Sequence, residues 1–287
     1  MQQEYRDAAL VVLGHGSTKN VDSEKPVLQH AAELAQRNIF AEVRPAFWKQ
    51  EPGVTEVLAG LSQERIFIAP LFVSEGYFSD EVIPAELGFR QAGEPMLNRM
   101  ILRGKQRLYY CRTVGSHDSM TKVLLARAHQ VIAQFPFPRA PRPEETTLFI
   151  AGHGTGRNDN SRKVIERQAQ LLQQLKVFAG VHAIFMEEEP RISGCYELSQ
   201  TRNIVVVPFF ISDGLHTQED IPVMLGAPER LVKERSAAGR AVWRNPTERQ
   251  GKLVWYTLSI GNEPHLADVI MELVREVVSA PALTTTL

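Results

Sequence analysis

Two histidines of this chain follow apolar segments and could together bind a metal ion. His153 lies in LFIAGHGT, and His216 lies in GLHTQEDIP, which follows the run NIVVVPFF after Ile211, Ser212 and Asp213. A neutral imidazole binds divalent transition metals through a ring nitrogen. Between the histidines, MEEEP contains Glu187 and Glu189, and a carboxylate can bind metal or accept protons. These blocks predict a metal-handling site with open coordination positions.

The same blocks occur earlier in the chain, but the second histidine is missing there. LVVLGHGS contains His15, 138 residues before His153. At the same offset, FWKQEP precedes FMEEEP, and PLFVSEGYFSDEVIP precedes PFFISDGLHTQEDIP. In the last pair, Phe78 stands where the later copy has His216. We therefore expect the metal chemistry in the C-terminal half, with the N-terminal half as scaffold and substrate surface.

Short apolar runs alternate with helix-length amphipathic segments in each half of the chain. In the second half the runs are TLFIAG, GVHAIF and NIVVVPFF. Near-continuous apolar strands separated by helices favour a parallel sheet that is buried on both faces. Ligands collect at the carboxyl ends of such strands. Because each chemical block follows one of these strands, we expect the blocks to meet in space.

A proline-rich segment separates the two halves. QFPFPRAPRPEETT has four prolines in fourteen residues, and proline disfavours both helix and strand ladders. We predict an N-terminal domain over 1–135, a linker over 136–146 and a C-terminal domain over 147–287, which suits a chain of 287 residues. The second half also has extra residues, rich in Arg and Glu, between Pro222 and Lys252. This insertion predicts a surface helix and loop.

Composition limits the classes of function. A net charge of -1 and a pI near 6.7 argue against a broad nucleic-acid-binding surface. Cys111 and Cys195 are the only cysteines, and without a CxxC pair they do not predict an iron–sulfur cluster or a disulfide framework. No apolar window approaches the ~18 residues of a membrane span, and MQQEYRDAAL lacks the features of a signal peptide. We expect a cytoplasmic protein with no membrane or nucleic-acid partner.

Taken together, the blocks resemble the class II tetrapyrrole chelatases, specifically the CbiX and sirohydrochlorin cobaltochelatase or ferrochelatase group. The resemblance depends on GHGT with His153, on EP with Pro190, and above all on GLHTQEDIP with His216, Asp220 and Pro222, and it covers almost the whole chain. It implies two tandem flavodoxin-like α/β domains, each with a parallel sheet flanked by helices, facing across one cleft. Because the duplication supplies both domains, we expect a monomer that forms a pseudo-dimer.

The resemblance also implies an activity and roles for the residues. The activity is that of a lyase, a sirohydrochlorin chelatase, which inserts Co²⁺, Fe²⁺ or Ni²⁺ into a sirohydrochlorin-type tetrapyrrole without ATP, organic cofactor or iron–sulfur cluster, in cobalamin or siroheme biosynthesis. His153 and His216 would present the metal. Glu187 would accept a proton, with Glu189 as a competitor because MEEEP is one residue shorter than the common family pattern. Asp220 would orient His216 or cap the following helix.

A substrate with many carboxylates predicts basic and aromatic side chains around the site. Arg157 and Arg191 lie just after the C-terminal motifs, and we expect them to bind substrate, the alternative being solvated surface arginines. In the N-terminal half, Trp48, Tyr77 and Phe78 would form an aromatic surface for the substrate, and His15 would face the substrate. For His15 the alternative is an inherited structural turn.

Two other functions stay open at this point. A non-catalytic relative could bind tetrapyrrole or metal for delivery, storage or regulation, which would suit the loss of a histidine from one half. An enzyme that transfers phosphate through a histidine would need an arginine before that histidine, and GHG has a glycine there.

Overall fold

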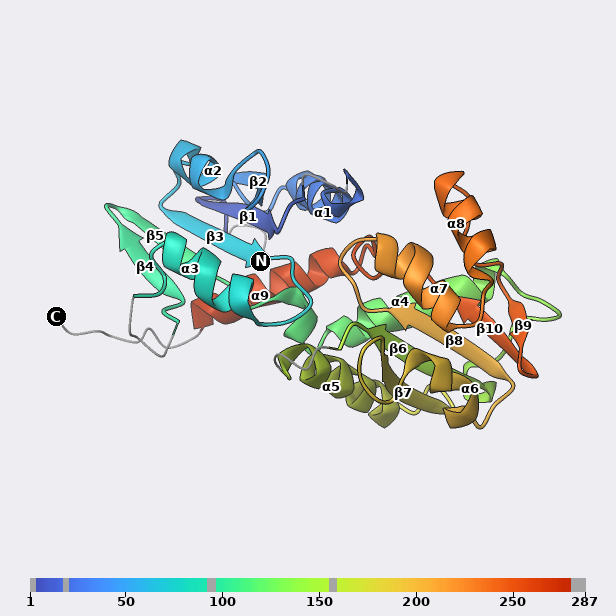
Figure 1. The fold of residues 1–287 in the computed structure, drawn as a ribbon. Coiled ribbons are helices and arrows are strands. Elements are labelled where there is room, and N and C mark those ends of the chain that lie inside the picture. Colours follow the sequence, from blue (N-terminus) through green and yellow to red (C-terminus); the bar gives the residue numbers. More distant parts are fainter. Residues whose placement is uncertain (1–3, 18–20, 92–96, 155–158, 280–287) are drawn as a thin grey trace. The chain divides into compact units, whose positions relative to one another are not determined.

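The computed structural model describes residues 4–17, 21–91, 97–154 and 159–279 (Figure 1). The chain divides into two compact units. Unit 1 comprises residues 1–117 and 264–287, and unit 2 comprises residues 118–263. No helix of the described residues is long and apolar enough to cross a membrane.

Within its described residues, unit 1 forms a five-stranded sheet in the order β2-β1-β3-β5-β4. The strands β2, β1, β3 and β5 are parallel, and β4 runs antiparallel to β5. The interior strand β1 is buried at every position because helices cover both faces of the sheet. The elements are β1 (Ala8–Gly14), α1 (Lys25–Gln36), β2 (Glu42–Phe47), α2 (Val54–Gly60), β3 (Arg65–Pro70), a π-helix (Tyr77–Val82), α3 (Ile83–Glu86), β4 (Met100–Arg103), β5 (Gln106–Tyr110) and α9 (Leu266–Ser279), with 3-10 turns at Val21–Ser23 and Val114–Ser116.

Over its described part, unit 2 repeats this pattern as a five-stranded sheet in the order β7-β6-β8-β10-β9. Here β7, β6, β8 and β10 are parallel, and β9 runs antiparallel to β10. The predicted α/β class, with parallel strands flanked by helices in both halves, is confirmed. The elements are α4 (Met120–Gln134), β6 (Thr146–Gly152), α5 (Asn160–Gln174), β7 (Gly180–Phe185), α6 (Cys195–Leu198), β8 (Asn203–Pro208), a π-helix (His216–Asp220), α7 (Ile221–Met224), α8 (Glu229–Ala237), β9 (Thr247–Arg249) and β10 (Lys252–Tyr256), with 3-10 turns at Pro143–Glu145 and Ile192–Gly194.

The last helix of each sequence half belongs to the unit formed mainly by the other half. Helix α4 packs on β8, β10 and α5 of unit 2, whereas α9 packs on α1, β3 and β5 of unit 1 (Figure 1). The compact units thus follow packing, whereas the predicted boundaries at 135 and 147 follow the sequence repeat. Both helices have an apolar face that must be buried, and the repeat alignment does not say which sheet each one covers.

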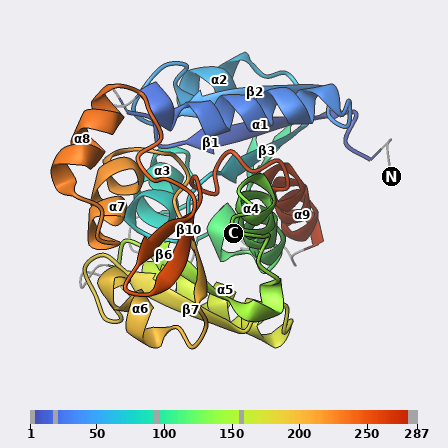
Figure 2. The same ribbon diagram turned by 90° about the vertical axis from the view of Figure 1, so that its right-hand side faces the viewer.

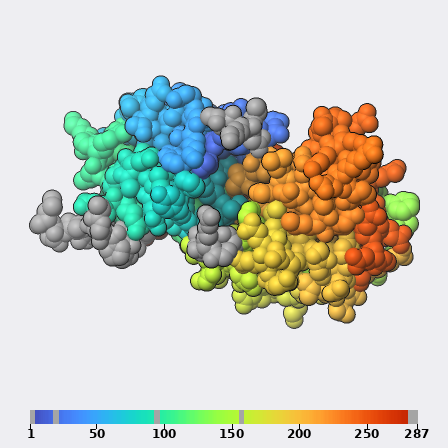
Figure 3. Space-filling model, viewed as in Figure 1, coloured from blue at the N-terminus to red at the C-terminus, as the bar shows by residue number. Residues whose placement is uncertain are grey.

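The predicted insertion forms a helix on the surface of unit 2. Helix α8 lies beside α7 and projects from the surface (Figures 2 and 3). Its Val232 is fully buried, and the hydroxyl of Ser236 donates a hydrogen bond to Oε1 of Glu219 at 3.1 Å. The insertion thus packs against the π-helix His216–Asp220.

Candidate functional site

The carboxyl ends of three neighbouring strands bring the chemical blocks of unit 2 together. His153 follows β6, Glu187 follows β7, and His216 begins the π-helix after β8. The ring centroids of the two histidines are 5.0 Å apart, and their planes are inclined by 79°. Nε2 of His153 lies 3.8 Å from Oε1 of Glu187. All three side chains are at least partly exposed to solvent.

Hydrogen bonds determine which nitrogen of each imidazole can bind a metal. Nδ1 of His153 lies 2.7 Å from the carbonyl oxygen of Gly154, and Nδ1 of His216 lies 2.7 Å from Oδ2 of Asp220. A carbonyl and a carboxylate can only accept a hydrogen bond, so each Nδ1 must carry the proton. In the neutral rings, Nε2 then keeps its lone pair. The arrangement therefore leaves Nε2 of both rings as the nitrogen that could accept a metal ion.

The loop after β6 makes a sharp turn in contact with the loop after β7. Gly154 has a φ of +67°, and a Cβ at this position would lie 3.0 Å from Cβ of Phe185. The backbone N–H of Glu187 donates to the carbonyl of His153 at 3.1 Å. Glycine is required because the left-handed conformation and the close approach both exclude a side chain. This turn holds His153 against the start of the glutamate segment.

The π-helix that carries His216 is held by buried hydrogen bonds. The backbone N–H of Gly214 donates to Oγ1 of Thr217 at 3.0 Å, and the hydroxyl of Tyr256 donates to the carbonyl of Thr217 at 2.7 Å. Burial raises the pKa of Tyr256 well above its usual range, so its hydroxyl stays a donor. Asp220 forms no side-chain cap on α7. Of the two roles expected for Asp220, its contacts favour the orientation of His216.

The three consecutive glutamates have different partners. Glu187 faces His153, whereas Oε2 of Glu188 lies 3.2 Å from Nη1 of Arg162. Glu189 is 80% exposed and accepts a hydrogen bond from the backbone N–H of Arg191 at 3.0 Å. The geometry therefore favours Glu187 over Glu189 as the carboxylate beside the histidines.

The structure brings one of the two predicted substrate arginines into the glutamate loop. Nη1 of Arg191 donates to the carbonyl of Met186 at 2.6 Å, so part of its guanidinium stabilises the loop after β7. Arg157 lies outside the described residues.

Unit 1 has an aromatic cluster at the position of the paired histidines. The ring centroid of His15 lies 4.9 Å from that of Phe78, 5.3 Å from that of Trp48 and 6.4 Å from that of Phe72. Nδ1 of His15 lies 2.8 Å from the carbonyl oxygen of Gly16, as in the second copy. The histidine loop is thus repeated, but the neighbours of His15 are the aromatic rings of Phe78, Trp48 and Phe72.

Two further substitutions accompany Phe78, and our sequence reasoning missed both. Lys49 corresponds to Glu187, and Val82 corresponds to Asp220. The same 138-residue offset that identified Phe78 could have found them. Unit 1 therefore lacks counterparts of His216, of the carboxylate beside His153 and of the carboxylate that contacts Nδ1 of His216.

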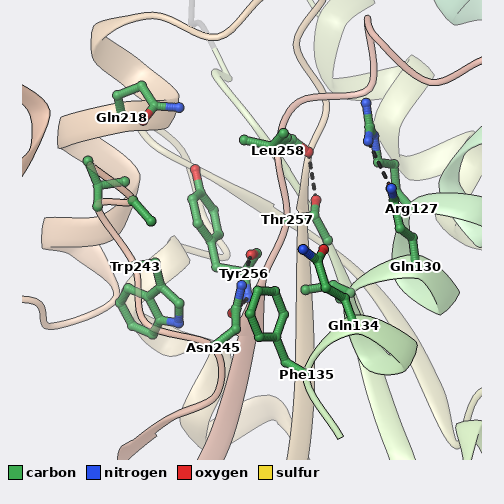
Figure 4. A pocket seen from close by; sticks show the side chains of 13 residues that line it. Arg127, Gln130, Gln134, Phe135, Gln218, Trp243, Asn245, Tyr256, Thr257 and Leu258 are labelled. Atoms are coloured by element: carbon green, nitrogen blue, oxygen red, sulfur yellow. Dashed lines mark hydrogen bonds between the residues drawn. The ribbon is translucent and has the colours of Figure 1, made fainter. Parts of the chain in front are cut away.

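A separate pocket of about 220 Å³ lies in unit 2 (Figure 4). Aromatic side chains of Trp243 and Tyr256 and polar side chains of α4, including Arg127 and Gln130, contribute to its lining. Burial lowers the pKa of Arg127, although Glu263 lies 3.7 Å from its Nε. Neither His153 nor His216 lines this pocket, so it is distinct from the histidine site.

The histidine site is open. Within the described parts of the chain, no group of three or more His, Cys, Asp or Glu residues is arranged so that it could enclose a metal ion. This site offers two imidazoles and the carboxylate of Glu187, which lies 3.8 Å from Nε2 of His153.

Known proteins are similar to this chain over one or both copies of its repeat. The CbiX family model matches residues 9–131 and again 147–277. A probable sirohydrochlorin cobaltochelatase from Halobacterium salinarum is 38% identical over 274 residues, covering 92% of this chain and 89% of that protein. A sirohydrochlorin cobaltochelatase from Methanopyrus kandleri is 28% identical over 137 residues, covering 45% of this chain and 94% of that protein.

Solved structures agree with the family match. A multi-domain protein from Deinococcus radiodurans, described as structurally similar to chelatases, gives a TM-score of 0.75 at 26% identity over 93% of this chain. This chain spans 54% of the Deinococcus protein. SirB from Bacillus subtilis, solved with Fe³⁺, gives a TM-score of 0.65 at 16% identity, over 94% of this chain and 95% of SirB, which shows a shared fold. With its two family-model matches and its close halobacterial relative, the chain belongs to the CbiX family of chelatases.

Proposed function

We propose that this chain is a sirohydrochlorin chelatase, a lyase that inserts Co²⁺ into a sirohydrochlorin-type tetrapyrrole, with Fe²⁺ and Ni²⁺ as the other candidate metals. The observation that carries the proposal is the pair formed by His153 and His216, whose rings lie 5.0 Å apart with both Nδ1 atoms bound to acceptors. The names of the halobacterial and Methanopyrus relatives support sirohydrochlorin as the tetrapyrrole and cobalt as the metal.

The reaction exchanges two protons for one metal ion. The macrocycle loses both pyrrole N–H protons, and the divalent metal leaves its waters and protein ligands to bind the four ring nitrogens. His153 and His216 would hold the metal through Nε2 and leave its remaining positions open to the ring. The products are the metallated tetrapyrrole and two protons, so no ATP or organic cofactor is needed for the balance.

Glu187 is the proposed acceptor of a pyrrole proton. Its carboxylate is 59% exposed and lies 3.8 Å from Nε2 of His153, beside the proposed position of the metal. Such a carboxylate can take a proton as the metal enters and release it to solvent. Asp220 would act through His216 by holding its ring and tautomer.

The substrate would also contact residues outside the histidine pair. We infer that His15, Tyr77 and Phe78 provide an aromatic surface for the ring and that Arg157 and Arg191 bind its carboxylates. The T-shaped packing of Tyr77 on Phe78, at 5.4 Å, and the exposure of Tyr77 support an accessible aromatic surface. The reaction would take place in the cytoplasm as a step of cobalamin or siroheme biosynthesis, with the chain acting as a monomer.

Absorption spectroscopy tests the proposal directly. Purified protein is mixed anaerobically with sirohydrochlorin and Co²⁺, Fe²⁺ or Ni²⁺, and the spectral change of metal insertion is followed over time. We expect a rate above the uncatalysed reaction that is lost in His153→Ala and His216→Ala. Tight binding of sirohydrochlorin or metal without such a rate would contradict the chelatase and favour a binding protein for delivery, storage or regulation.

A further inference from the structure

We propose that Lys49 of unit 1 binds a peripheral carboxylate of the tetrapyrrole and thereby helps to select and orient it. This inference rests on the proposed function, because it concerns the same substrate. The carboxylate of the substrate would bind at Lys49, the position of unit 1 that corresponds to Glu187 beside the proposed metal ligands of unit 2.

The backbone places Lys49 and Glu187 equivalently in their units. The N–H of Lys49 donates to the carbonyl of His15 at 2.9 Å, and the N–H of Glu187 donates to the carbonyl of His153 at 3.1 Å. Each side chain thus begins beside the histidine loop of its own unit. A carboxylate at this place attracts a divalent cation, whereas an ammonium repels it and attracts an anion.

Aromatic rings position the ammonium group of Lys49. Its Nζ lies 4.7 Å from the ring centroid of Trp48 and 5.4 Å from that of Phe78, which allows a cation–π interaction with both rings. The indole is itself held, because Nε1 of Trp48 donates to Oε2 of Glu86 at 2.8 Å. The aromatic cluster therefore restricts a side chain that is ordinarily flexible.

The ammonium is available to a ligand. Lys49 is an exposed residue, and among the described residues no carboxylate forms an ion pair with it. Tyr77, which is 62% exposed, lies next to Phe78 and adds an accessible apolar surface beside the charge. A cation fixed beside an exposed aromatic ring suits a planar molecule with carboxylates at its edge.

The experiment measures the binding of metal-free sirohydrochlorin by the full chain. Affinity is determined by absorption titration at low and at high ionic strength for the wild type, Lys49→Met, Lys49→Arg and Lys105→Met. Lys105 is the matched control because it is an exposed lysine in the turn between β4 and β5, at the opposite end of the sheet. We expect Lys49→Met to weaken binding about fivefold at low salt and to reduce its salt dependence.

The variants distinguish charge from structure. Lys49→Arg should retain the affinity and the salt dependence, and Lys105→Met should resemble the wild type. An unchanged affinity in Lys49→Met, or an equal loss in Lys49→Arg, overturns the role of Lys49 while leaving the chelatase proposal intact. If the wild type does not bind sirohydrochlorin at all, the proposed function and this inference both fail.

Discussion

The two units have the same scaffold but different side chains at the site. In each, the loop after the second strand donates to the carbonyl of the histidine, and a buried tyrosine donates to the carbonyl of a hydroxyl residue in the π-helix. That tyrosine is Tyr110 in unit 1, at 2.9 Å from the carbonyl of Ser79, and Tyr256 in unit 2. At the site itself, the side chains differ at three positions that matter for the chemistry: Phe78 stands for His216, Lys49 for Glu187 and Val82 for Asp220.

The backbone geometry of the site is therefore the same in both units, although the side chains that could do chemistry differ. The glycine with a positive φ after the histidine and the π-helix occur in both units, although unit 1 has Phe78 in place of a second histidine. These two features therefore belong to the fold, and the proposed metal function depends on a few side chains. The comparison can be tested by changing those side chains in each unit.

The largest effect is expected from His216→Ala. Removal of one of two imidazole ligands should lower the rate of metal insertion about a thousandfold, because several kcal/mol of metal binding are lost. Phe78→Ala, at the equivalent position of unit 1, should instead raise KM for sirohydrochlorin with a much smaller effect on kcat. Steady-state kinetics with Co²⁺ measure both. Similar losses of kcat in the two variants would break the assignment of metal chemistry to unit 2.

Glu187→Gln should have the next largest effect. Loss of the proton acceptor should lower kcat about a hundredfold, while the neutral amide keeps the size of the side chain. Glu189→Gln is the matched comparison, and we expect a smaller loss because that carboxylate faces Arg191 and solvent. Kinetics at saturating substrate decide between them. A greater loss in Glu189→Gln would transfer the role to Glu189.

Asp220→Asn should lower metal affinity about tenfold, because the carboxylate that holds Nδ1 of His216 is lost. Calorimetry with Co²⁺ measures this affinity, and Glu219→Gln serves as a neighbouring control. If Asp220→Asn binds Co²⁺ as tightly as the wild type does, the contact between Asp220 and His216 does not contribute to metal binding.

Grafting the side chains of unit 2 into unit 1 should create a weak metal site. The combined changes Lys49→Glu, Phe78→His and Val82→Asp are made in a His153→Ala/His216→Ala background. We expect them to raise the affinity for Co²⁺ about tenfold above that of the background. The visible absorption of bound Co²⁺ gives the measurement. A folded variant with no gain would mean that the aromatic neighbours of His15 also prevent metal binding.

The smallest effect is expected for the shared tyrosines. Tyr256→Phe leaves the buried carbonyl of Thr217 without its donor and should lower the free energy of unfolding by about 1 kcal/mol. Tyr110→Phe should do the same through Ser79. Thermal and urea denaturation measure both variants. Chelatase activity should fall more in Tyr256→Phe, because His216 lies next to Thr217.

Sequence patterns predicted the sheets and the meeting of the histidine blocks. The apolar runs identified the strands, and the rule that ligands collect at their carboxyl ends placed His153, Glu187 and His216 together. The exchange of α4 and α9 could not be predicted, because an apolar helix face fits either of two similar sheets. The choice between Glu187 and Glu189 also required coordinates, since loop geometry decides which of two nearby carboxylates faces His153.

The exchanged helices make the repeat inseparable as a piece of protein. A chain cut in the proline-rich segment would leave each half with a helix whose apolar face has lost its sheet and with a sheet whose covering helix is missing. Each fragment would expose apolar surface unless its own helix packed back onto its own sheet. In the intact chain, each copy of the repeat thus supplies a helix that completes the interior of the other.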